Sequence, residues 1–125
     1  MTRKITAALL GVMHALNGLM MLLAGQRWYQ MVPGVTHTGP FNPHFVADIG
    51  AAYLAAGMAL AARAWRVDYW PAAVAGAGFL GLHAVIHLFD FVSGPDQDKS
   101  ALVLVVLPAL LAGWAALPEK GERHV

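Results

Sequence analysis

Long apolar segments constrain this chain more than any other feature. Four of them, at about residues 5–24, 44–62, 71–92 and 101–117, come close to the ~20 residues that a helix needs to cross a bilayer. They show no sustained alternation of apolar and polar residues, which favours helices over barrel strands. Only 12% of the 125 residues are charged, against roughly 25% in a water-soluble domain. The sequence therefore predicts an all-α integral membrane four-helix bundle, with four transmembrane helices in a single domain over 1–125.

Residues that begin, end or bend helices separate the four segments. Asn42 can cap the second helix with Pro43 in its first turn, and Pro71 can open the third. We expect Pro108 to bend the fourth helix, because proline has no N–H to donate. The connection 26–43 is polar and rich in Pro and Gly, and we expect either a plain surface loop or a lid there. The other boundary signals are Ser93, Gly94 and Pro95 after the third segment, Asp98 or Ser100 before the fourth, and Pro118 after it.

Basic residues divide unevenly between the two sides of the predicted membrane. With the N-terminus inside, six Lys or Arg residues fall on the inner side and two on the outer, which predicts cytoplasmic termini. We expect the protein to lie in a bacterial inner membrane. His14 and Asn17 interrupt the first segment, so we expect a retained helix and not a cleaved signal peptide. The inner six are Arg3, Lys4, Arg63, Arg66, Lys120 and Arg123, and the outer two are Arg27 and Lys99.

Ionisable side chains within the apolar segments are the main indication of function, because each costs ~2.5–3.5 kcal/mol at the centre of a membrane helix. On the third segment, His83, His87 and Asp90 fall within an arc of roughly 60° of one helix face. On the second, His44 and Asp48 are spaced i, i+4. Their stripe continues through small residues, which predicts that a neighbouring helix packs closely there. These small residues are Ala51, Ala55 and Ala62.

The depths of these residues agree across three helices. At about 1.5 Å of rise per residue, His14 and His83 fall near the membrane centre. Asp48 and His87 fall roughly a turn and a half further out. His44 and Asp90 fall near the outer boundary. We therefore predict one shared polar site in the outer half of the bundle.

Two kinds of cofactor suit such a site, and both would serve redox chemistry. Imidazole and carboxylate groups bind Cu, Fe or Zn. Haem would instead take His14 and His83 as axial ligands from different helices. The predicted metal ligands are His14, Asp48, His83 and His87, with His44, Asp90 and Asn17 around them or at a second site.

Two other functions remain open, and the sequence leaves undecided whether the chain is an enzyme. The chain can be a non-enzymatic accessory subunit of a larger membrane complex, with its polar residues forming interhelical hydrogen bonds. It can also be a small oligomeric proton-coupled transporter that uses Asp48. The expected partners are the lipid bilayer and either further copies of the chain or a larger membrane complex. A net charge of +1 gives no basis for binding nucleic acid.

Overall fold

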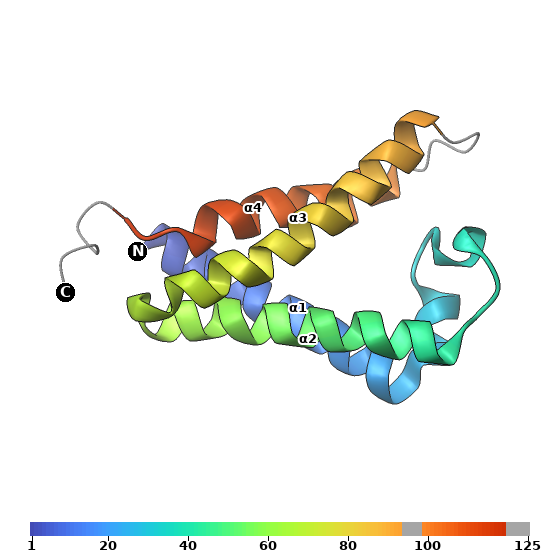
Figure 1. The fold of residues 1–125 in the computed structure, drawn as a ribbon, viewed down its shortest axis with the longest axis horizontal. Coiled ribbons are helices and arrows are strands. Elements are labelled where there is room, and N and C mark those ends of the chain that lie inside the picture. Colours follow the sequence, from blue (N-terminus) through green and yellow to red (C-terminus); the bar gives the residue numbers. More distant parts are fainter. Residues whose placement is uncertain (94–98, 120–125) are drawn as a thin grey trace.

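The computed structural model describes residues 1–93 and 99–119, and within these ranges all regular structure is helical (Figure 1). Four helices follow one another along the chain, and the last is preceded by a π-helical segment. They are α1 (Thr2–Met31), α2 (Pro43–Trp65), α3 (Trp70–Ser93) and α4 (Leu107–Ala116), with η1 (Val35–Thr38), η2 (Val67–Tyr69) and the π-helical η3 (Leu102–Val106) between them. The prediction of an all-helical chain is confirmed for these residues.

The helices form two hairpins, α1 with α2 and α3 with α4. The hairpins meet at the end of the molecule that carries Met1 and Glu119, here called the terminal end, and separate toward the opposite, distal end (Figure 1). Contacts join α2 to α3 and α1 to α4. Between the described parts of α1 and α3 there is no close backbone approach, whereas α2 and α4 each contact both of these helices.

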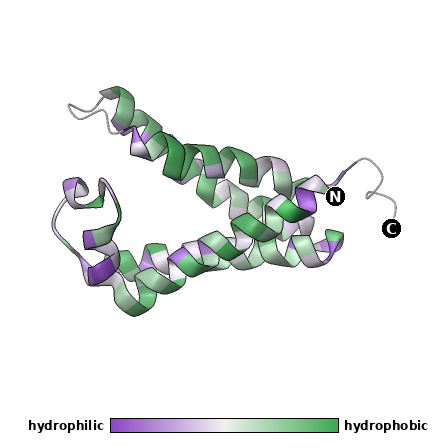
Figure 2. Cartoon of the chain, turned by 180° about the vertical axis from the view of Figure 1, so that it is seen from behind, coloured by the Kyte–Doolittle hydropathy of each residue, from purple (hydrophilic) through white to green (hydrophobic). Residues whose placement is uncertain are grey.

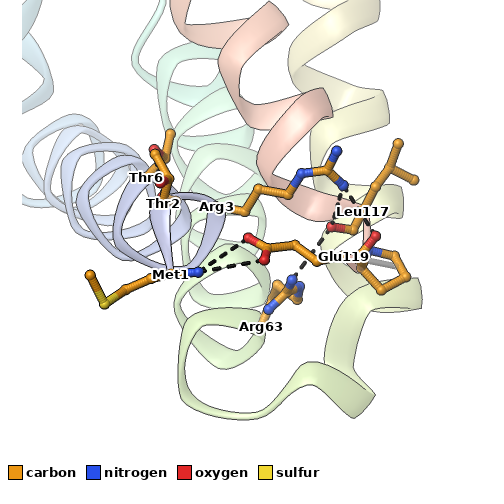
Figure 3. Close-up of polar contacts among 8 residues, drawn as sticks. Met1, Thr2, Arg3, Thr6, Arg63, Leu117 and Glu119 are labelled. Atoms are coloured by element: carbon orange, nitrogen blue, oxygen red, sulfur yellow. Dashed lines mark hydrogen bonds and ion pairs between the residues drawn. The ribbon is translucent and has the colours of Figure 1, made fainter. Parts of the chain in front are cut away.

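Polar contacts close the terminal end (Figure 3). The N-terminal ammonium of Met1 lies 3.3 Å from a carboxylate oxygen of Glu119. Arg3 donates hydrogen bonds to the backbone oxygens of Leu117 at 3.2 Å and Pro118 at 3.1 Å. The buried Arg63 also donates to the Leu117 oxygen, at 3.4 Å. The start of α1 and the ends of α2 and α4 are therefore joined at one point.

Three helical stretches are long and apolar enough to cross a membrane, which indicates a membrane protein. They are α1, α2 and the stretch Val67–Ser93, which combines η2 and α3. Apolar residues predominate along them (Figure 2), and many of their large apolar side chains are exposed. The fourth predicted segment is also helical, but its apolar helix Leu102–Ala116 is shorter. At 1.5 Å per residue it extends only about 22 Å, against a hydrocarbon core of about 30 Å.

Glycines bring α1 and α2 into close backbone contact. Gly11 and Gly18 on α1 and Gly50 and Gly57 on α2 are each spaced i, i+7, so each pair occupies one helix face. A Cβ added at Gly18 would lie 2.5 Å from the Gly50 oxygen, and one added at Gly11 would lie 2.7 Å from the Ala61 nitrogen. These glycines permit close approach in the way that small residues do at membrane helix interfaces.

The predicted packing face of α2 was wrong. Ala51 and Ala55 are exposed and Ala62 is half-buried, whereas Gly50 and Gly57, which lie on a different face of α2, are buried. Both faces carry small residues, but glycine lets backbones approach more closely than alanine does. The repeated seven-residue spacing of glycine in both segments was the signal that identifies the observed face.

A kink at Ala24 (φ −142°, ψ 41°) divides α1. The predicted end of the first segment, residue 24, coincides with this kink, but the helix continues to Met31, so the expected loop is helical in its first part. Beyond the kink, Trp28 donates from Nε1 to Oδ1 of Asn17 at 2.9 Å. In a straight helix these residues would be about 16 Å apart along the axis. The hydrogen bond therefore depends on the bend.

The described helix boundaries follow most of the predicted signals. The Asn42 side chain accepts a hydrogen bond from the Phe45 N–H at 3.1 Å, and Pro43 occupies the first turn of α2. Just before Pro108 the helix has a wider turn, in which the Leu107 N–H donates to the oxygen of Leu102, five residues earlier, and the expected bend at Pro108 stays a prediction. Gly94, Pro95 and Asp98 lie outside the described residues.

Candidate functional site

His83 and His87 form a pair on successive turns of α3. Their Nε2 atoms lie 3.2 Å apart, and both side chains are partly buried. The ring centroids are 4.7 Å apart and the ring planes are inclined at 69°. One ring donates its Nε2–H to the lone pair of the other, with the tautomers setting the direction. The i, i+4 spacing thus places two ligand-type nitrogens beside one another.

Tyr53 connects this pair to α1. Its ring stacks on His14 with centroids 5.6 Å apart and planes at 27°. It also meets His83 edge to face, at 5.6 Å and 82°. Phe79 packs against both Tyr53 and His83, at 5.4 and 6.0 Å. Contacting rings therefore run from α1 through α2 to α3, and Tyr53 and Phe79 are members that our sequence analysis missed.

The missed members had a partial signal in the sequence. Tyr53 carries a hydroxyl in the middle of an apolar segment, and a buried tyrosine usually serves a specific contact. Phe79 lies one turn before His83, on the same face of α3. Its apolar side chain gave no reason to single it out from the other apolar residues of the segment.

His14 is the most enclosed of the predicted site residues, with 6% of its surface exposed. Its Nε2 is buried and has no hydrogen-bond partner within the described ranges. The close approach of α1 and α2 at Gly11 and Gly18, on either side along α1, accounts for this burial. A buried polar atom without a partner lowers stability, because it lost its bonds to water on folding.

His44 and Asp48 form a separate pair on the first turns of α2. His44 Nε2 lies 3.5 Å from a carboxylate oxygen of Asp48, and their side chains are 89% and 63% exposed. Asp90, one turn beyond His87, is also exposed. The structure therefore joins His83 to His87 directly and to His14 through Tyr53, while Asp48, His44 and Asp90 lie on exposed surfaces.

The four predicted metal ligands do not meet at one point in this arrangement. In the part of the chain that the structure describes, no group of three or more His, Asp or Glu side chains is placed to hold a metal ion. The prediction relied on the depth of each residue in the membrane, which can be counted along each helix. The direction in which a side chain points around its helix axis depends instead on how the helices pack. Asp48 belongs to the exposed stripe of α2, whereas Tyr53 and Gly50 belong to the buried one.

The haem prediction meets a geometric difficulty. Axial ligands of one haem face each other across its iron, so the two imidazoles must border the same space, and that space must be free for the haem. Tyr53 contacts both His14 and His83 and occupies the space that joins them. As placed, these residues do not fit a bis-histidine haem.

Asn17 forms a hydrogen bond with Trp28 that spans the kink in α1. Its oxygen accepts the hydrogen bond from Trp28, and its nitrogen lies 3.7 Å from the sulfur of Met21.

A cavity of about 150 Å³ lies between α3 and the η3–α4 stretch, with apolar lining residues that include Gly81, Ala84 and Val106. Its lining offers no side-chain ligand atoms. The pair of histidines on α3 is therefore the best candidate site.

Comparison with known proteins identifies no relative: no protein family, no curated protein and no solved structure matches the chain. The accessory-subunit and transporter hypotheses stay predictions.

Proposed function

We propose that the chain is a four-span protein of a bacterial inner membrane that binds a transition-metal ion through His83 and His87. The observation that carries this proposal is the 3.2 Å separation of the two Nε2 atoms. A tetrahedral ion with metal–nitrogen bonds of ~2.0–2.1 Å needs two nitrogens about 3.3 Å apart. The pair already has this spacing, so an ion could bind without a change of backbone.

Metal binding would replace the hydrogen bond between the two rings. Both Nε2 lone pairs would then point at the ion, and the ring that carried its proton on Nε2 would carry it on Nδ1 instead. Imidazole nitrogens suit copper, iron and zinc. Tyr53, which contacts His83, would form the wall of the site toward α1.

The proposed orientation places the terminal end in the cytoplasm. Arg3, Lys4, Arg63 and Arg66 lie near the terminal ends of α1 and α2, whereas Arg27 follows the kink at the other end of α1. This distribution agrees with the positive-inside rule. His83 and His87, in the distal half of α3, then lie in the outer half of the membrane.

Metal analysis of the full chain tests the proposal. The protein carries a tag without histidine, is purified in mild detergent and is analysed for bound metal after exposure to copper, iron and zinc in turn. We expect bound metal in the wild type that is lost in His83→Ala and in His87→Ala. His37→Ala, at an exposed position in η1, is the matched control and should retain it. A folded wild type without metal, or a His83→Ala variant with unchanged metal, would overturn the proposal.

A further inference from the structure

The histidine pair supplies only part of a coordination sphere. A structural zinc ion takes four protein ligands in nearly all known sites, and the pair provides two. Within the described ranges no third His, Asp or Glu side chain joins the two imidazoles. Coordination of such an ion by four protein groups would therefore need ligands from outside this set of residues.

The helix face that carries the pair is open toward the distal end. His83, Ile86, His87 and Asp90 lie on one side of α3. Ile86 is 59% exposed, and Asp90 is exposed as well. α2 contacts this face through Tyr53, which meets His83 edge to face, and the two hairpins separate toward the distal end (Figure 1). A second helix can therefore approach His87 without displacing a helix of the same chain.

We propose that a second copy of this chain completes the site, so that His83 and His87 from two copies hold one ion with four imidazole nitrogens. This inference rests on the proposed function. A two-fold axis along the membrane normal would bring the same face of α3 from each copy together at the same depth. Two pairs with the observed nitrogen spacing then make a tetrahedral set, and Ile86 of each copy packs beside it.

Stoichiometry and mass measured together test this inference. The full chain, with a tag that lacks histidine, is examined in mild detergent by native mass spectrometry with Zn²⁺ and with EDTA. We expect a dimer with one ion per two chains, which EDTA converts to monomers. His83→Ala and His87→Ala should be monomeric in both conditions, and the control His37→Ala should behave as the wild type.

The possible failures of the two proposals are distinguishable. One ion bound per chain, or a metal-loaded monomer, would overturn the shared site but leave metal binding by the pair intact. A folded wild type that binds no Zn²⁺, Cu²⁺ or Fe²⁺ would overturn both. Co-expression of wild type with the double variant His83→Ala/His87→Ala, each with its own tag, gives a second readout. We expect no mixed dimers, and mixed dimers as abundant as wild-type dimers would also overturn the shared site.

Discussion

The Nε2 atoms of His83 and His87 lie 3.2 Å apart, a separation that suits a hydrogen bond and equally suits two ligands of one tetrahedral ion. In metal-free protein the pair therefore has a measurable interaction energy. We expect a double-mutant cycle with His83→Leu and His87→Leu to give a coupling of about 0.6–1.7 kcal/mol in the free energy of unfolding. The measurement is unfolding by SDS titration in the presence of EDTA. Additive effects of the two substitutions would show that the rings do not interact.

The glycine contacts between α1 and α2 predict a strong difference between two similar substitutions. Gly18→Ala should lower the free energy of unfolding by about 1–3 kcal/mol, because its Cβ would meet backbone atoms of α2 at 2.5 Å. Gly81→Ala is the control, since a Cβ there has no neighbour within 4 Å. It should be neutral or stabilising by up to about 1 kcal/mol. Equal effects in SDS unfolding would contradict the close packing of α1 and α2.

The hydrogen bond between Trp28 and Asn17 should stabilise the kink at Ala24. Trp28→Phe removes the donor but keeps an aromatic ring, and it leaves the Asn17 oxygen without this partner. We expect a loss of roughly 1–3 kcal/mol in the free energy of unfolding. In the background of Asn17→Leu the same substitution should cost much less, because the acceptor is already absent. A cost of Trp28→Phe that does not depend on Asn17 would argue against this contact.

His14 should be replaceable without loss of stability. Its Nε2 is buried with no partner among the described residues, so His14→Leu removes an unfavourable polar atom and keeps most of the volume. We expect the free energy of unfolding to stay unchanged or to rise by about 1 kcal/mol. His14→Gln, which keeps polar atoms at this position, should give no such gain. A clear loss of stability in His14→Leu alone would mean that the imidazole contributes more through its stacking on Tyr53, or through a bound water molecule or ligand, than its buried Nε2 costs.

Arg63 and Arg66 provide a matched pair at the terminal end. Arg63 is 1% exposed and donates to the Leu117 oxygen, whereas the side chain of Arg66 is 59% exposed and pairs with Asp68 at 3.1 Å. We expect Arg63→Met to lower the free energy of unfolding by about 1.5–3 kcal/mol. Arg66→Met should change it by less than about 1 kcal/mol, as exposed ion pairs contribute little. Similar losses in both variants would contradict the burial of Arg63.

The sequence alone determined the helices and many of the positions at which they begin and end. Apolar length predicted the helical segments, because an apolar run of this length satisfies its backbone in lipid only as a helix. The Asn42 cap depends on local chemistry and was visible in the sequence, whereas residue 24, predicted as the end of the first segment, is a kink within a longer helix. The i, i+4 spacing of His83 and His87 likewise sufficed to place them together, since helix geometry alone brings them into contact.

Tertiary packing decided which helix faces meet. The depth of His14, Asp48 and His83 could be counted along each helix, but their azimuth depends on which small residues form the interface. Gly50 and Gly57 bring α2 against α1 more closely than Ala51 and Ala55 would, and this choice turns Tyr53 inward and Asp48 outward. Periodicity specifies each helix separately. Only the fit between two helix surfaces selects the residues that become neighbours, and that fit depends on both helices at once.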